Sequence, residues 1–253
     1  MAVIAVFNQK GGVGKTTTCM NVSAALALLD RNPLAIDLDP QGHLTLSSGV
    51  KAVQGADSIA AFYTENKLLS ALVRELPEGL RLIPAHMDLY KIEALYGNSK
   101  SIASRLKRGL EKLVQPDTPT LIDCCPMLGV LSLNAMFAAD RVLIPVSTDF
   151  LSLQGVQRLD MALAVLERTL GRKIPRKVVM TRFDGRRKLS HEIYDQLKAQ
   201  FGEDLCETRI AENVSLAESP AHGKNVFAFA PNSQGAKDYN ALTAELLAKG
   251  FFQ

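Results

Sequence analysis

Short apolar runs alternate along this chain with longer segments in which apolar residues recur every three or four positions. The short runs predict buried strands at residues 3–7, 34–38, 80–84, 119–123 and 174–181. The periodic segments predict helices at residues 16–29, 57–63, 68–76, 88–96, 101–114 and 189–201, and residues 149–155 lead into a further long helix. This alternation predicts an α/β fold, a doubly wound, mainly parallel sheet flanked by helices on both faces.

The chain is long enough for one large domain with a full core, since it has 253 residues of which 47% are hydrophobic. It contains no low-complexity tract, internal repeat or Pro/Gly/Ser-rich hinge. The densest irregular stretch, residues 39–55, is expected to form loops within the domain. We therefore predict a single domain over residues 1–253.

Residues 10–17 read Lys-Gly-Gly-Val-Gly-Lys-Thr-Thr and lie between the first predicted strand and the first predicted helix. A glycine-rich turn there directs backbone N–H groups inward, and the helix adds its positive N-terminal end. Lys15 is placed to reach the outer phosphates of a nucleotide triphosphate and Thr16 to ligate magnesium. Gln9 replaces the first glycine of the general pattern, and Lys10 is an additional lysine. The expected nucleotide contacts are Lys10, Gly11, Gly12, Val13, Gly14, Lys15, Thr16 and Thr17.

Aspartates stand at the carboxyl ends of two predicted strands. Asp37 and Asp39 belong to the sequence Asp-Leu-Asp-Pro-Gln-Gly, and Asp123 ends a later apolar run. Open α/β sheets bind their ligands at this edge, where a carboxylate opposite a phosphate loop can hold Mg²⁺ through water. Acids beside Pro-Gln-Gly are also common in turns, so the first pair alone leaves both interpretations open. Asp123 is the stronger magnesium candidate.

Composition limits the cellular compartment and the classes of binding partner that we expect for this protein. The first apolar run is short and has no basic segment before it, so we expect a buried strand and not a signal peptide. The four cysteines have no metal-binding spacing and two are adjacent, which is typical of reduced cytoplasmic thiols. The net charge of +3 is too small to indicate nucleic-acid binding, unless the basic residues are clustered.

The loop with its second lysine resembles that of the deviant Walker A ATPases, the family of ParA and MinD proteins, and the chain looks like a ParA- or Soj-like member. The resemblance runs from residue 1 to about residue 247 and includes the helix and strand at residues 131–145. It implies that Lys10 acts on phosphates across a dimer and that Asp39, in the first switch, places metal and attacking water. It also makes Asp123 the Walker B residue, although Cys125 and Met127 replace a usual proline and serine.

The same resemblance extends to the C-terminal part of the chain, where residues 210–224 look like the family's adenine-side loop. It implies weaker nucleotide contacts by Thr181 and Asn213. The expected catalytic residues are then Lys10, Lys15 and Asp39, and the expected metal residues are Thr16, Asp39 and Asp123. ATP and Mg²⁺ are the implied cofactors, with slow hydrolysis in a homodimer stimulated by a ParB-like or other adaptor protein.

A DNA-binding surface is suggested by residues 172–188, in which eight lysines and arginines face the single acid Asp184. Such a run neutralises phosphates without reading bases, although a solvated surface remains the alternative. The expected DNA contacts are Arg182, Arg186, Arg187 and Lys188. Arg186 falls where the family has a DNA-contacting arginine, whereas Glu212 and Ser215 stand where many relatives have arginines. Asn232 and Gln234 likewise replace a frequent Lys and Arg, so the surface is altered.

The resemblance implies a nucleoid-associated ATPase that segregates chromosome or plasmid DNA, or spaces a large protein cargo. The alternative is a MinD-like, membrane-associated regulator of division or flagellar placement. Such proteins end in a basic amphipathic helix, whereas residues 240–253 hold one lysine and one glutamate. An iron–sulfur carrier would need cluster cysteines in a spacing that is absent here. Metabolic ligases share the loop, and the ParA-like C-terminal half argues against them.

Overall fold

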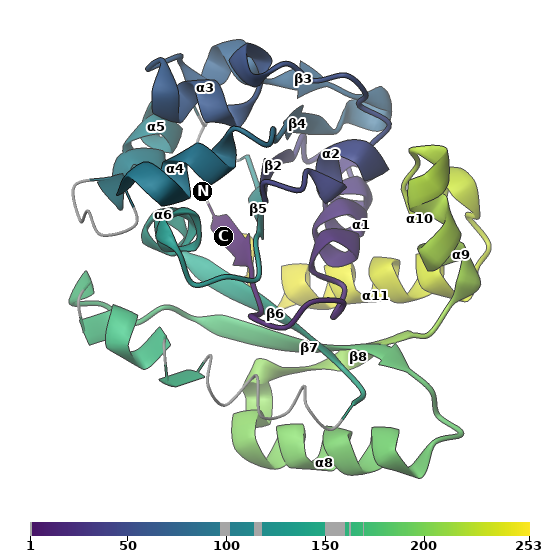
Figure 1. Ribbon diagram of the computed structural model, residues 1–253. Coiled ribbons are helices and arrows are strands. Elements are labelled where there is room, and N and C mark those ends of the chain that lie inside the picture. Colours follow the sequence, from purple (N-terminus) through teal and green to yellow (C-terminus); the bar gives the residue numbers. More distant parts are fainter. Residues whose placement is uncertain (1, 97–101, 114–117, 150–159, 162, 169) are drawn as a thin grey trace.

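The computed structural model describes residues 2–96, 102–113, 118–149, 160–161, 163–168 and 170–253. Its centre is an eight-stranded sheet of order β3-β4-β2-β5-β1-β6-β7-β8 (Figure 1). The strands are β1 (Val3–Val6), β2 (Leu34–Leu38), β3 (Arg74–Glu75), β4 (Arg81–Ile83), β5 (Thr120–Cys124), β6 (Arg141–Ser147), β7 (Arg176–Phe183) and β8 (Leu205–Ala211). The β3–β4 pair is antiparallel and the other pairs are parallel, which confirms the predicted fold class.

Helices cover both faces of the sheet (Figure 1). One face carries α1 (Lys15–Ala27), α2 (His43–Ser47), α9 (Val214–Glu218), α10 (Val226–Phe229) and α11 (Gln234–Ala248). The other carries α3 (Ile59–Thr64), α4 (Leu89–Tyr96), α5 (Arg105–Leu113), α6 (Val130–Ala138) and α8 (Lys188–Phe201). Short 3-10 turns lie at η1 (Gly55–Asp57), η2 (Leu69–Leu72), η3 (Pro77–Gly79), η5 (Gly202–Asp204) and η6 (Ser219–His222).

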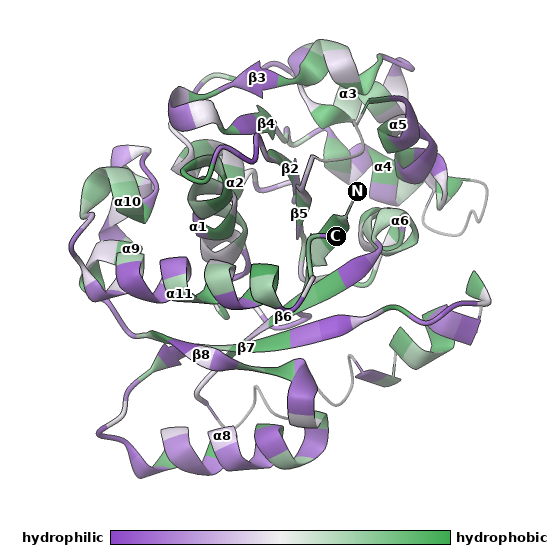
Figure 2. Cartoon of the chain, turned by 180° about the vertical axis from the view of Figure 1, so that it is seen from behind, coloured by the Kyte–Doolittle hydropathy of each residue, from purple (hydrophilic) through white to green (hydrophobic). Residues whose placement is uncertain are grey.

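Strand β1 is buried on both of its faces, and this is why residues 3–6 are all apolar. Val3 and Ala5 belong to the core on the α6 side, while Ile4 and Val6 belong to the core on the α1 side. All four residues are buried, as expected for a central parallel strand covered on both faces. In Figure 2 the peripheral helix α8 is mostly hydrophilic, because much of its surface meets water.

The register of the central strands brings their carboxyl ends to one edge. Val6 at the end of β1 is aligned with Asp123 of β5, which is aligned in turn with Asp37 of β2. The residues that follow these strands therefore converge on the loop at residues 10–17.

Two sequence expectations need correction, and one strand was missed. Residues 39–55 contain α2, which starts after Gly42 in a left-handed conformation (φ 65°). Residues 68–76 form the turn η2 and then β3, because the chain extends at Val73 and pairs with β4. Strand β8 was not predicted; its charged residues fit an edge strand, whose outer N–H groups are met by α11 carboxylates.

Other predicted elements are found within a few residues of their expected ends. The predicted helix 101–114 is observed as α5, while residues 101 and 114 lie outside the described residues. Of the stretch 149–155, residues 150–155 also lie outside them, and the following segment is helical at residues 160–161, 163–168 and 170.

The C-terminal end packs onto the protein. Phe251 is 3% exposed and belongs to the core on the α1 side. Arg141 donates hydrogen bonds to the carbonyls of Phe251 and Gln253. Among the helices that the structure describes, none is long and apolar enough to cross a lipid bilayer.

Candidate functional site

The loop after β1 wraps around the N-terminus of α1. Gly12 and Gly14 adopt left-handed backbone angles, with φ of 73° and 84°, which residues with a side chain rarely adopt. Gly14 is the N-cap of α1 and has no side chain with which to cap it, and none of the hydrogen bonds among the described residues caps the helix there. The first N–H groups of α1 are therefore left for a bound anion, and the helix dipole favours negative charge at this point.

Lys15, the first residue of α1, is 8% exposed, and its ammonium donates a hydrogen bond to the Lys10 carbonyl at 2.9 Å. Burial lowers its pKa, and the nearby Asp123 carboxylate opposes this shift. A phosphate in the loop would add negative charge beside this largely buried ammonium.

Asp123 fits a divalent cation. It is 1% exposed, and neither of its oxygens has a hydrogen bond of normal geometry among the described residues, although the Thr16 side chain is near enough to oppose the rise in its pKa. Burial raises its pKa well above the usual range, and the charge of Asp37 adds to the shift. A buried carboxylate of this kind costs free energy unless a cation or a donor pairs with it. Because Thr16 lies at the neighbouring end of α1, its hydroxyl and Asp123 form a donor set suited to Mg²⁺.

The two aspartates of β2 and its end have different surroundings. Asp37 is fully buried and accepts hydrogen bonds from the backbone N–H and the hydroxyl of Thr45, at 2.7 and 2.6 Å. Burial raises its pKa to about 6. Asp39 lines the cleft, and its Oδ1 accepts the N–H of Gln41 at 2.9 Å. Asp37 thus holds α2 in place, while Asp39 faces the space where a ligand would bind.

A cleft of about 650 Å³ opens above the loop. Of the expected nucleotide contacts, it is lined by Gly11, Gly12, Gly14, Lys15, Thr16, Thr17, Thr181 and Asn213. Val13 is buried beneath the loop, where its carbonyl accepts a hydrogen bond from the Thr181 hydroxyl at 2.9 Å. The Asn213 side chain caps α9 by accepting the N–H of Ser215.

Lys10 does not line the cleft, because its ammonium pairs with Asp149, which follows β6. The pair lies beside the loop and within one chain. The cross-dimer role of Lys10 stays a prediction, and Lys10 would have to leave Asp149 to reach the phosphates of a partner chain.

Sequence reasoning missed five lining residues, which come from segments far apart in the chain: Gln41, His43, Ser47, Pro126 and Tyr239. Arg182, expected as a DNA contact, also lines the cleft, as do Ile210, Glu212, Leu216 and Ala217 of the segment that resembles an adenine-side loop. The Tyr239 hydroxyl, on α11, is 3.1 Å from the Thr18 hydroxyl on α1, so the C-terminal helix is fixed to the phosphate-loop helix. Only the motif order around residues 210–224 gave a signal for this side of the cleft.

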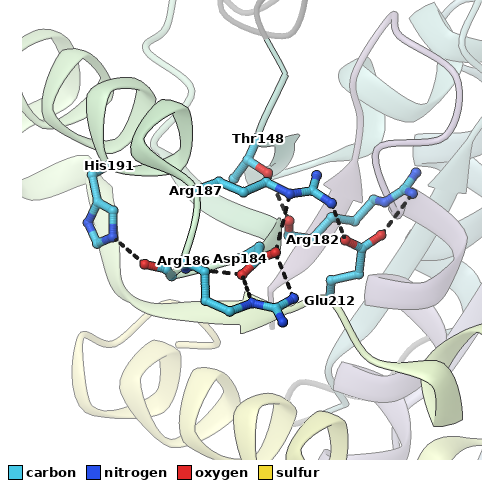
Figure 3. A network of polar contacts seen from close by, with 8 residues as sticks. Thr148, Arg182, Asp184, Arg186, Arg187, His191 and Glu212 are labelled. Atoms are coloured by element: carbon cyan, nitrogen blue, oxygen red, sulfur yellow. Dashed lines mark hydrogen bonds and ion pairs between the residues drawn. The ribbon is translucent and has the colours of Figure 1, made fainter.

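Three of the expected DNA contacts, Arg182, Arg186 and Arg187, lie together between the end of β7 and the start of α8 (Figure 3), and the fourth, Lys188, is the first residue of α8. Arg186 and Arg187 are largely exposed and both pair with Asp184. Arg182 pairs with Glu212 and lines the cleft, and Lys188 pairs with Glu192 at 3.4 Å. We call residues 182–188 the basic loop. It adjoins the cleft through Arg182.

Comparison with known proteins shows which family this chain belongs to. A family model described as an AAA domain matches residues 1–175. The chain is 39% identical over 251 residues to the chromosome-partitioning ATPase Soj of Thermus thermophilus, covering 97% of this chain and 95% of that relative. It is 37% identical over 257 residues to the chromosome partitioning protein ParA of Caulobacter vibrioides, covering 98% and 95%.

The fold is also similar to solved structures. One is the cobyrinic acid a,c-diamide synthase of Mycobacterium smegmatis with bound ADP and magnesium. The match has a TM-score of 0.84 and 30% identity, and it covers 98% of this chain and 94% of that one.

Proposed function

Because the chain belongs to the ParA/Soj-like P-loop ATPases of the deviant Walker A family, we propose that it is a partition or positioning ATPase. It binds ATP with Mg²⁺, dimerises around two ATP molecules, and binds DNA without sequence preference in that form. Hydrolysis, stimulated by a ParB-like or other adaptor protein, then releases it. The cargo is chromosome or plasmid DNA, or a large protein assembly carried on the nucleoid.

The observation that carries the proposal is the loop at residues 10–17 facing Asp123. Lys15 and the uncapped start of α1 supply positive charge, and Asp123 supplies a buried carboxylate without a hydrogen bond of normal geometry among the described residues. Mg²⁺ held near Thr16 and Asp123 would neutralise charge on the phosphates. Asp39, at the rim of the cleft, is suited to orient a water molecule for attack. This combination fits phosphoryl transfer to water.

The DNA-binding part rests on the basic loop and on the names of the two relatives, a chromosome-partitioning ATPase and a chromosome partitioning protein. Arg186, Arg187 and Lys188 are exposed at the start of α8, where the helix N-terminus also favours phosphate. A dimer presents two such loops, so each phosphate contact is doubled. Binding is then expected to be sensitive to salt and to protein association.

A sedimentation experiment tests the proposal. The protein is mixed with two unrelated DNA duplexes and with ATP, ADP or no nucleotide, all with Mg²⁺. We expect similar binding to both duplexes with ATP and much weaker binding otherwise. A protein that ignores DNA in every condition and associates with anionic vesicles would instead be a membrane-bound regulator of the MinD kind.

A further inference from the structure

Two carboxylates face the arginines of the basic loop, and they come from different parts of the chain (Figure 3). Asp184 belongs to the loop itself. Its oxygens accept hydrogen bonds from Arg186 Nε and Nη2 at 2.9 and 3.0 Å, and from the Arg186 backbone N–H at 3.0 Å. Arg187 Nε is 3.2 Å from the same carboxylate. Asp184 therefore shapes the loop locally.

Glu212 reaches the loop from outside, directly after β8. Its backbone N–H donates to the Phe183 carbonyl at 3.1 Å, which fixes it beside the end of β7. Oε1 accepts a hydrogen bond from Arg182 Nη2 at 3.2 Å, and Oε2 is 3.8 Å from Arg187 Nη2. One carboxylate thus lies between two guanidinium groups, with each of its oxygens directed to one of them (Figure 3).

The ion pairs of Glu212 occupy guanidinium groups that could otherwise bind a DNA phosphate. Guanidinium N–H groups bind phosphate and carboxylate oxygens with the same charge-assisted, often bidentate geometry. The side chains of Arg187 and Glu212 are 62% and 44% exposed, so a phosphate from solvent can reach both. To bind Arg182 fully, that phosphate must replace Glu212. At Arg187 it must replace Glu212 at Nη2, while Nε stays beside Asp184 at 3.2 Å.

We propose that Glu212 competes with DNA phosphates for Arg182 and Arg187, and that it thereby sets the DNA affinity of this ATPase. This inference rests on the proposed DNA binding, and it identifies Glu212 as a residue that limits the affinity for DNA. Asp184 is less suited to this role, because its carboxylate also accepts the backbone N–H of Arg186 and so fixes the shape of the loop. Glu212 holds the loop through these two side chains, and a substitution there leaves the contacts of Asp184 in place.

The position of Glu212 dictates one condition of the test. Glu212 and Arg182 both line the cleft with the phosphate loop. Arg182 has a left-handed backbone (φ 52°), and its carbonyl accepts a hydrogen bond from the Thr148 hydroxyl at 2.8 Å. A change at Glu212 can therefore alter nucleotide binding. DNA affinity must be compared at saturating ATP and Mg²⁺, with nucleotide affinity measured separately for each variant.

The test compares Glu212→Gln with Glu207→Gln. Both variants remove one negative charge, but Glu207 lies in β8 and its carboxylate forms none of these pairs. At saturating ATP, Glu212→Gln should bind duplex DNA about fivefold more tightly than wild type, because each protomer of the dimer loses two weak, exposed ion pairs, those with Arg182 and Arg187. Its affinity should also fall more steeply with salt, because each additional phosphate that the protein neutralises adds about 0.9 to the log–log slope. Equal affinities of the two variants would overturn the inference.

A double-mutant comparison separates competition from a general charge effect. In an Arg182→Gln/Arg187→Gln background, measured at low salt, Glu212→Gln should no longer change DNA affinity, because the guanidinium groups that it releases are gone. An equal increase in affinity in that background would contradict the inference. It would mean that the lost negative charge acts on DNA directly.

The outcomes also separate this inference from the proposed function. If wild type binds DNA and reversal of Arg186, Arg187 and Lys188 abolishes binding, the proposed function stands whatever Glu212→Gln does. If wild type fails to bind DNA and Glu212→Gln binds it, the competition is strong and the inference holds. If neither protein binds DNA at saturating ATP, the inference fails together with the proposed DNA binding.

Discussion

The ammonium of Lys10 forms an ion pair with the carboxylate of Asp149 in the same chain. Lys10 precedes the paired glycines of the phosphate loop, and Asp149 follows β6, so the pair connects two neighbouring strand ends. The Asp149 carboxylate also accepts a hydrogen bond from the Ser147 hydroxyl at 2.7 Å, which holds it in place. If Lys10 acts on the phosphates of a partner protomer, dimer formation must break this pair.

The first prediction is that Lys10→Ala loses ATP-dependent dimerisation while retaining ATP binding within a few-fold. The reason is that Lys10 does not line the cleft of its own chain. Analytical ultracentrifugation with ATP and Mg²⁺ measures the dimer, and a nucleotide titration measures the affinity. Asp149→Asn should act in the opposite direction and favour the dimer by up to about tenfold, since two partly exposed pairs no longer have to break. Loss of ATP affinity in Lys10→Ala as large as its loss of dimer would exclude the cross-dimer role.

The second prediction is that Lys15→Ala and Lys15→Gln abolish the stabilisation of the fold by ATP. Ligand at 100 times its dissociation constant stabilises a protein by about 2.7 kcal/mol, and this stabilisation should disappear without the ammonium. The fold itself should tolerate the change within about 1 kcal/mol, because the substitution also removes a buried charge. Thermal unfolding with and without ATP and Mg²⁺ measures both effects. An undiminished shift with ATP would rule out a phosphate contact by Lys15.

The third prediction is that Asp39→Ala binds ATP but hydrolyses it at least about 100-fold more slowly, because no carboxylate remains to orient the attacking water. Trapped ATP should hold the variant as a dimer. Size-exclusion chromatography in ATP, with phosphate release measured in parallel, checks both. Asp37→Asn is not an equivalent control, since Asp37 holds α2 through Thr45. A monomer with unchanged turnover would disprove the assigned role.

The fourth prediction concerns the support of β8, the strand that places Glu212. Burial alone would raise the pKa of Glu245, but Lys249 and the N–H groups of Thr208 and Glu207 lower it to about 2. A carboxyl pKa below its unfolded value stabilises the fold above about pH 4.5, and this contribution disappears as the pH falls toward 2. With allowance for solvent screening, Glu245→Gln should cost about 2 kcal/mol at neutral pH.

Urea unfolding across the pH range checks this prediction, with Glu218→Gln as the exposed control. The difference between wild type and Glu245→Gln should shrink below pH 4.5 and vanish near pH 2. A difference that is constant with pH would mean that the carboxylate charge does not hold α11 to β8.

The sequence predicted the parts of the fold that depend on local pattern. The apolar run before Lys10 and the periodic segment after it are sufficient to place β1, the phosphate loop and α1, because each has a distinct signature. Strand β8 was missed because it is an edge strand whose apolar residues are interrupted by the polar run Glu207, Thr208 and Arg209, none of which is buried. Its outer backbone groups are paired by Glu245 and Asp238, more than 25 residues away in the chain, and no local pattern shows this.

For the functional site, too, sequence predicts what depends on local pattern and does not predict contacts between distant side chains. Lys15 and Thr16 begin the helix that follows the loop after β1, and Asp123 lies near the end of the neighbouring strand β5, so their proximity could be inferred from the expected sheet. The pairing of Lys10 with Asp149 and of Glu212 with Arg182 and Arg187 could not, because it depends on side-chain directions after folding. A count of charges predicts an exposed basic run at residues 172–188. The structure adds that three of its arginines share two carboxylates, Asp184 and Glu212.

The central claim, that ATP controls DNA binding through the basic loop, is tested most directly by one gel-shift series. Wild type and the Arg186→Glu/Arg187→Glu/Lys188→Glu variant are titrated onto unrelated duplexes, with and without ATP, at rising salt. We predict steeply salt-dependent binding by wild type in ATP alone, and no binding by the variant although its ATP turnover without DNA is unchanged. Binding that survives the three reversals, or that is equally strong without ATP, would contradict the account.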